Sequence, residues 1–293
     1  MRPGFALALL AVIGAVVLSA AGSTASLMQW SDLTSRPRPT GAERLHYGSA
    51  PSQVIDVWRP SGGGPFPVVV MIHGGCWTKS VAGLDLMDWA AADLRKRGVA
   101  VWNIEYRRLG EAGGGYPGTY QDVAAAIELL RTEAPKRGLK LDRLVVVGHS
   151  AGGHLALWAA GRRKLPKSSP LYSPDPLTPT AVIDLAGIAN LETDTDTGCG
   201  ADTVAAMAGP VRPGRFDDTS PAALLPLGVP TYVIHGADDT TVAPSVGRAY
   251  VALAQAAGDK VEMREPQGGH AEEIAPGSAS WDATADLIVS LVR

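Results

Sequence analysis

The sequence has no basic stripe formed by clustered lysine and arginine residues, no visible internal repeat, and only two cysteines among its 293 residues. The formal net charge is −3, so neither charge nor its distribution favours a nucleic-acid-binding protein. Hydrophobic residues make up 46% and charged residues 19%, which is typical of a globular protein with a sizeable core. The length fits one large domain or two small ones.

The N-terminus begins with one arginine, an apolar run from Phe5 to Leu18, and then small residues. The run is short for a membrane span, and this layout is typical of a secretory signal peptide. We predict a signal peptide over residues 1–25, cleaved after Ala21 or Ala25. The mature protein, residues 26–293, is then secreted or periplasmic and keeps no membrane span. The alternative is an anchor left uncleaved in the membrane.

Apolar strand patterns alternate with helical patterns along the mature chain. Residues 66–73 form a continuous β-branched run, typical of a strand covered on both faces, whereas residues 53–60 alternate like a half-buried strand. The alternation predicts a single α/β domain with a doubly wound, mostly parallel sheet and helices on both faces. Residues 188–226 lack apolar periodicity. We expect them to form an insertion or lid near the carboxyl ends of the strands, where ligands bind in such folds.

A candidate nucleophile lies in the stretch "VVVGHSAGGHLALW". The pattern G-x-S-x-G, with Ser150 at its centre, stands between an apolar strand and an apolar-faced helix, as in a nucleophile elbow. The helix N-terminus favours negative charge at this point, and the backbone N–H of Ala151 is a predicted oxyanion donor. The alternative is an ordinary serine in a glycine-rich turn.

A serine hydroxyl needs a base, and the base needs an acid that holds its tautomer. Two aspartates, Asp238 and Asp239, follow the strand pattern "VPTYVIHG", and His270 follows the strand pattern "KVEMREP". The order serine, aspartate, histidine is the one expected for a nucleophile elbow on a parallel sheet. We predict His270 as the base and either Asp239 or Asp238 as the acid, with Asp184 a third candidate.

The second oxyanion donor is expected from a glycine-rich loop after an earlier strand. The stretch "HGGCW", His73 to Trp77, has that position and composition. The backbone N–H groups of Gly74, Gly75 and Cys76 are the candidates, and Gly75 and Cys76 are favoured. The alternative is a simple turn.

The motifs "HGG", "GHSAGG", "HGADD" and "GGH" together resemble the α/β-hydrolase superfamily, in its esterase/lipase branch, over about residues 52–292. In that family the loop pattern H-G-x-x-D-x-x-V carries the acid, and this alignment selects Asp239. The resemblance implies that His235 is a packed residue at a strand end. His149 and His154 are interpreted as structural, with a substrate contact as the alternative.

The spelling H-G-G-x-W resembles two branches of the family. One contains secreted esterases that act on acylated plant polysaccharides or small esters, and the other contains kynurenine formamidases, which usually have Tyr where Cys76 stands. Trp77 either lines an acyl or aryl pocket or packs in the core. Export to an oxidising compartment permits a Cys76–Cys199 disulfide, which would tie the insertion to the oxyanion loop. Two free thiols are the alternative.

Together these motifs predict a serine hydrolase that cleaves small or carbohydrate-linked esters through an acyl-enzyme intermediate. The mechanism requires no metal and no organic cofactor. An amidase or arylformamidase with the same triad is one alternative. A non-catalytic binding protein on the same fold is another. Neither the oligomeric state nor the acyl and alcohol groups of the substrate follow from the sequence.

Overall fold

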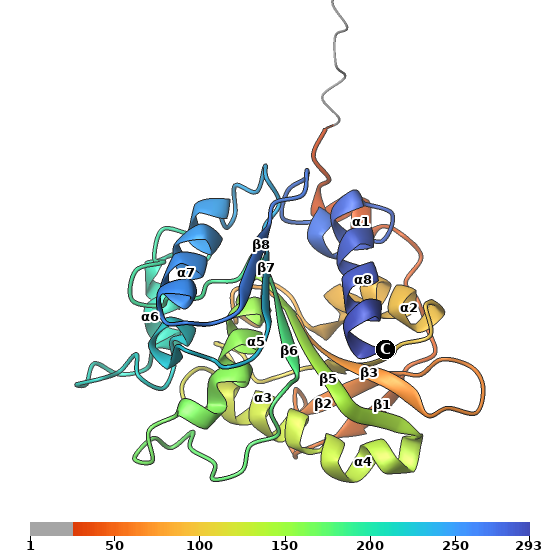
Figure 1. Ribbon diagram of the computed structural model, residues 1–293, viewed down its shortest axis with the longest axis horizontal. Helices are drawn as coiled ribbons and strands as arrows, with labels where there is room; N and C mark the ends of the chain where they lie inside the picture. Colours follow the sequence, from red (N-terminus) through yellow and green to blue (C-terminus); the bar gives the residue numbers. More distant parts are fainter. Residues whose placement is uncertain (1–25) are drawn as a thin grey trace, which may run out of the picture.

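The computed structural model describes residues 26–293, so the predicted signal peptide lies outside the described residues (Figure 1). One eight-stranded sheet has the order β1-β2-β4-β3-β5-β6-β7-β8. β1 and β2 pair antiparallel, as do β2 and β4, and every other pair is parallel. The strands are β1 (Glu43–His46), β2 (Val54–Trp58), β3 (Phe66–Ile72), β4 (Ala100–Ile104), β5 (Leu139–His149), β6 (Ala181–Leu185), β7 (Thr231–Ile234) and β8 (Val261–Arg264).

Helices lie on both sides of this sheet (Figure 1). They are α1 (Trp30–Thr34), α2 (Asp88–Lys96), α3 (Gly118–Glu128), α4 (Leu130–Arg137), α5 (Ala151–Gly161), α6 (Ala201–Met207), α7 (Pro244–Ala256) and α8 (Ala279–Val292). Short 3-10 helices span Leu84–Met87, Arg162–Lys164, Pro221–Leu224 and Glu272–Ile274. The mostly parallel sheet with helices on both faces confirms the predicted α/β-hydrolase fold. No helix in the described range is long and apolar enough to cross a membrane.

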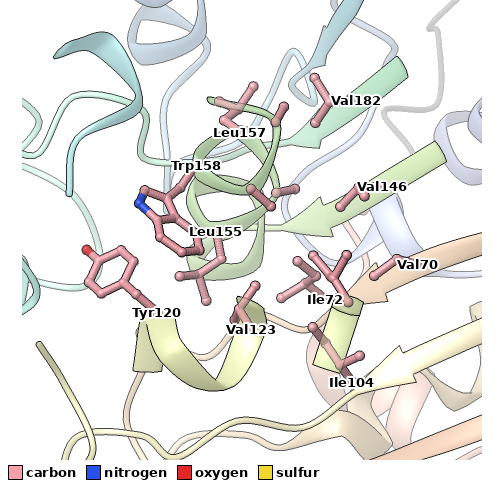
Figure 2. Packing of buried hydrophobic residues seen from close by; sticks show 14 of the residues in the cluster. Val70, Ile72, Ile104, Tyr120, Val123, Val146, Leu155, Leu157, Trp158 and Val182 are labelled. Carbon is pink, nitrogen blue, oxygen red and sulfur yellow. The ribbon is translucent and has the colours of Figure 1, made fainter. Parts of the chain in front are cut away.

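The core divides into two layers because neighbouring side chains of a strand point to opposite faces of the sheet. In β3, Val70 and Ile72 belong to the cluster that contains residues of α3, α5 and α7. Val69 and Met71 belong instead to the cluster with residues of α2 and α8. Figure 2 shows side chains of β3, β4, β5 and β6 packed against α3 and α5. Burial on both faces fixes the register of the strands and the positions of their carboxyl ends.

β2 differs from its predicted half-buried state, since all five of its residues are buried. It lies between β1 and β4, so both of its edges are also covered. Its one charged residue, Asp56, accepts two hydrogen bonds of 2.7 Å from the guanidinium of Arg44 on β1. The alternating pattern was misleading because a paired carboxylate can occupy a covered position.

The insertion, residues 188–226, contains α6 and the 3-10 helix Pro221–Leu224. Hydrogen bonds from buried aromatic and histidine side chains fasten it to the rest of the domain. Trp158 on α5 donates to the Asp218 carbonyl at 2.9 Å, and His154 donates to the Thr219 carbonyl at 2.8 Å. Tyr120 on α3 donates to the Met207 carbonyl at 3.0 Å. These bonds attach the insertion to α3 and to α5, the helix that follows Ser150.

Candidate active site

Ser150 stands between β5, which ends at His149, and α5, which begins at Ala151. Its backbone has φ 56° and ψ −122°, a conformation that a non-glycine residue adopts only where the surrounding structure imposes it. The flanking glycines are required by close packing. A Cβ on Gly148 would lie 1.9 Å from the Gly152 carbonyl, and one on Gly152 would lie 2.2 Å from the Ile72 carbonyl. The G-x-S-x-G spacing is therefore a steric requirement of this turn.

The structure brings together the predicted base and one of the predicted acids. His270, in the loop after β8, donates from Nδ1 to Asp239 Oδ2 at 2.6 Å. Asp239, after β7, also accepts from the N–H groups of Thr241 (2.7 Å) and Val242 (3.1 Å). Burial alone would raise the pKa of Asp239, but its hydrogen bond to His270, the charge of that ring and the two N–H groups hold the pKa below its usual range. An ionised Asp239 leaves His270 Nε2 free to accept a proton.

The neighbouring Asp238 has a different role. Its carboxylate accepts from the side chain of Gln267 and from the N–H of Gly268 at 3.3 Å. Both donors lie in the turn that precedes His270. Asp184, the third candidate, is fully buried, and burial raises its pKa to about 8. The geometry thus selects Asp239 as the partner of His270.

Ser150 and His270 line the same pocket, which has a volume of about 220 Å³. Within residues 26–293 no hydrogen bond joins Ser150 Oγ to His270. In the absence of substrate such catalytic hydrogen bonds are often long or poorly aligned, and they tighten in the substrate complex. Gly75 and Cys76 also line this pocket. A carbonyl carbon held against Ser150 would therefore have both the base and the glycine-rich loop beside it.

Three consecutive residues of the glycine-rich loop have positive φ angles: Gly75 (98°), Cys76 (51°) and Trp77 (50°). Among the described residues, no acceptor takes the backbone N–H of Gly74, Gly75 or Cys76. Ala151 opens α5, so its N–H has no acceptor within the helix. Of the loop residues only Gly75 and Cys76 line the pocket, which leaves their N–H groups available to a ligand oxygen.

This loop is held in place by a buried carboxylate, that of Glu105, which the sequence analysis did not identify. Glu105 follows β4 and accepts from His73 Nε2 at 2.7 Å and from the Leu84 N–H at 3.0 Å. Burial alone would raise the pKa of Glu105, but the charge and hydrogen bond of His73, with Arg108 and the Leu84 N–H, lower it. Tyr106 donates to the His73 carbonyl at 2.9 Å. The only signal was a glutamate at the end of an otherwise apolar strand.

A disulfide joins Cys76 to Cys199, with the Cα atoms 5.2 Å apart and a sequence separation of 123. It ties the glycine-rich loop to the insertion. Trp77, the next residue, is fully buried in the core cluster and packs edge-on against His154, with ring centroids 5.2 Å apart. Since it does not line the pocket beside Ser150, the geometry favours core packing over the substrate-binding role considered for Trp77.

His149 lines the pocket and donates from Nε2 to the His270 carbonyl at 3.1 Å. Burial, with the neighbouring His270, lowers its pKa well below the usual value, so the ring is neutral. His154 and His235 are fully buried, and burial lowers the pKa of each to about 4. Both are packed inside the domain, whereas His149 is in a position to touch a ligand.

One group of side chains could in principle share a cation: His149, His270 and Glu273 have ligand atoms within 4.8 Å of one another. Each of the three residues has one internal hydrogen-bond partner, while Glu273 Oε2 has none among the described residues. His270 donates to Asp239, His149 donates to the His270 carbonyl, and Glu273 accepts from the Gly236 N–H at 2.6 Å. Burial raises the pKa of Glu273 well above its usual range, which disfavours its charged form.

The wall of the pocket contains two residues that the sequence did not suggest. Trp30 and Thr34 of α1 line it, whereas no residue of the insertion does. The indole of Trp30 stands edge-on to the rings of His149 and His270, with ring centroids 5.9 Å apart in each case. A tryptophan in an otherwise polar lead-in was the only signal in the sequence.

This mostly parallel sheet with helices on both faces is the α/β-hydrolase fold. The chain belongs to the BD-FAE family, whose model matches residues 55–251. It is 28% identical over 257 residues to "Esterase LipC" of Mycobacterium tuberculosis (strain ATCC 25618 / H37Rv), which covers 80% of this chain and 60% of that relative. The chain thus spans about 60% of the length of this relative.

Two solved structures illustrate the same fold. A truncated form of a carbohydrate esterase from gut microbiota superposes with a TM-score of 0.72 at 22% identity, covering 87% of this chain and 97% of that one. Esterase B from Lactobacillus rhamnosis (HN001) superposes with a TM-score of 0.70 at 22% identity, covering 85% and 86%. At this identity the likeness concerns the fold alone.

Proposed function

We propose that the protein is a serine esterase with Ser150 as nucleophile, His270 as base and Asp239 as the acid that orients the base. The observation that carries the proposal is the His270–Asp239 hydrogen bond of 2.6 Å beside a strained Ser150, with Ser150 and His270 lining one pocket. The esterase names of its relatives support the same chemistry. No cofactor enters the reaction.

The reaction proceeds in two halves. In the first, His270 Nε2 takes the proton of Ser150 as Oγ bonds to the carbonyl carbon, and the N–H groups of Ala151, Gly75 and Cys76 stabilise the resulting oxyanion. The bond to the alcohol oxygen then breaks, and His270 returns the proton to the departing alcohol. In the second half, His270 takes a proton from water, which attacks the acyl-enzyme. The carboxylic acid leaves, and Ser150 regains its proton.

Labelling with a fluorophosphonate probe tests the nucleophile. We expect one covalent adduct on Ser150, seen by mass spectrometry, and none in Ser150→Ala. The variant should also lose p-nitrophenyl acetate hydrolysis. Absence of labelling in the natural protein would overturn the proposal and favour a non-catalytic binding protein. Faster cleavage of formyl aryl amides than of aryl esters would favour the amidase alternative instead.

For the substrate we propose small or carbohydrate-linked esters. The apolar residues beside Ser150 and the small volume of the pocket support a small acyl group. The names of two structural neighbours, a carbohydrate esterase and a bifunctional GH43-CE protein of Bacteroides eggerthii, support a sugar as the alcohol. A comparison of acetylated oligosaccharides with simple alkyl acetates tests this choice, since similar rates on both would remove the case for a sugar.

We also propose that the protein is exported. The layout of residues 1–25 supports a cleaved signal, and the Cys76–Cys199 disulfide is of the kind that persists in an oxidising compartment. N-terminal sequencing of the protein recovered outside the cytoplasm should begin at Gly22 or Ser26. An intact Met1 in a membrane fraction would favour the anchored alternative.

A further inference from the structure

α1 covers the pocket as a separately attached wall. The side chain of Leu33 is fully buried in the same cluster as residues of α2 and α8. The N–H of Met28 donates to Glu272 Oε1 at 2.6 Å, and Glu272 Oε2 accepts from the Gly269 N–H at 3.1 Å. Glu272 therefore links the start of α1 to the loop that carries His270, and Trp30 is held above that loop.

Trp30 separates two hollows. The pocket of about 220 Å³ contains Ser150, and a second hollow of about 130 Å³ lies beside it. Trp30, Thr241 and His270 line both of them, so the indole is one of three side chains at the boundary between the two. Removal of the indole would join the hollows into one longer cavity that begins at Ser150.

The apolar part of the pocket lies beside the oxyanion loop. Val81, Ala82 and Leu86 line it together with Gly75 and Cys76, whose N–H groups face no internal acceptor in the described residues. A carbonyl oxygen bound at those N–H groups brings its attached acyl chain against the apolar side chains.

We propose that the pocket takes the acyl group of the substrate and that Trp30 sets the upper limit of its length. This inference rests on the proposed esterase function. The natural protein then prefers short acyl chains, because a longer chain meets the indole. Trp30 acts on specificity alone, since none of the bonds broken or formed in the reaction involves it.

A chain-length series tests the limit. We would measure kcat/KM for p-nitrophenyl esters from acetate to dodecanoate with the natural protein, Trp30→Ala and Trp30→Phe. For Trp30→Ala we expect the ratio of octanoate to acetate to rise about tenfold or more, because several methylenes become buried, and Trp30→Phe should give an intermediate ratio. Leu253→Ala is the matched control, because Leu253 is similarly exposed (45% against 39% for Trp30) and lies on α7.

Far-UV circular dichroism and urea unfolding show whether each variant is folded, independently of its activity. An equal fall for every ester in Trp30→Ala would overturn the inference, because it indicates a purely structural role. A second series, with acetate fixed and the alcohol varied from ethyl to octyl, should be unchanged. A shift there instead would assign the pocket to the alcohol and also overturn the inference. Fluorophosphonate labelling of Ser150 reports separately on the proposed function, so failure of one does not imply failure of the other.

Discussion

The oxyanion loop and helix α1 both line the pocket beside Ser150, yet they are held in different ways. The loop has three consecutive positive φ angles and is fixed by a disulfide and by the buried His73–Glu105 pair. α1 spans only five residues, and its Trp30 is 39% exposed. It is attached by one buried leucine and a few hydrogen bonds.

Under the proposed function, the firmly held loop serves the chemical reaction and the loosely held α1 serves the choice of substrate. Oxyanion donors must be held in one geometry before substrate arrives, and strained backbone persists only where the surrounding structure imposes it. A wall that limits chain length needs only to occupy space. Changes to the loop and the triad should therefore alter the rate for every ester, whereas changes to α1 should alter the ratio between esters.

Asp239→Asn should have the largest effect of the changes considered, and it should act on kcat. An asparagine cannot hold His270 in the required tautomer or stabilise its charged form, so kcat should fall about 10⁴-fold for short and long acyl esters alike. Asp238→Asn is the matched control and should change kcat less than about threefold, within the range of a surface substitution. Equal losses in the two variants, measured with p-nitrophenyl acetate and hexanoate, would contradict the choice of Asp239.

Removal of the disulfide should have the next largest effect, both on the free energy of unfolding and on kcat. In Cys76→Ser/Cys199→Ser the unfolded chain gains freedom, so the free energy of unfolding should fall by about 2–4 kcal/mol. The strained loop should also relax, and partial loss of an oxyanion donor should lower kcat about tenfold. Urea unfolding and the ester series measure both. A change in the chain-length ratio without a change in kcat would contradict the division between loop and α1.

Asp184→Asn tests a fully buried carboxyl in β6 that lies outside the proposed triad. The folded pKa of Asp184 is raised to about 8, so the neutral carboxyl contributes stability below about pH 4 that is lost as the pH rises towards 8. The asparagine variant lacks this dependence and should be about 1–3 kcal/mol more stable at pH 8. Unfolding in urea at pH 5 and pH 8 measures the difference. An equal effect at both pH values would show that the carboxyl does not titrate between them.

Local patterns in the sequence were sufficient to predict the elbow and the sheet. The turn at Ser150 depends on glycines within two residues of it, and strand and helix periodicity are also local properties. The acid was harder, because Asp238 and Asp239 are adjacent and the strand patterns alone do not distinguish them, whereas the structure pairs Asp239 with His270. The family pattern favoured the same residue.

The remaining features arise from contacts between segments that are distant in sequence. Glu105 follows β4 and accepts a hydrogen bond from His73, which follows the neighbouring strand β3. The rings of Trp30 and His270 are in contact although the two residues lie near opposite ends of the chain. Neither residue has a neighbour in sequence that signals its role. Trp77 was ambiguous for a similar reason, since a tryptophan after the oxyanion loop fits a pocket wall or a core equally well until its burial is known.

Arg36→Ala should have the smallest effect, and it acts on the α1 side alone. Arg36 donates to the Pro276 carbonyl at 2.8 Å and so helps to fix the end of α1. Its loss should change the free energy of unfolding by less than about 0.5 kcal/mol. Hydrogen exchange of the amides of α1 should quicken about twofold or more, since local opening needs fewer contacts to break, while exchange of residues 74–77 stays unchanged.

Arg59→Ala is the control for that variant, because Arg59 is exposed and also donates to a backbone carbonyl, that of Arg137 at 3.4 Å. It should leave α1 exchange and the ester ratio as they are. In Arg36→Ala the octanoate-to-acetate ratio should rise about twofold, because a looser α1 lets Trp30 give way to a longer chain. Equal quickening of exchange in α1 and in the oxyanion loop would mean that the two segments open as one unit. The proposed contrast between a rigid oxyanion loop and a more mobile α1 would then be wrong.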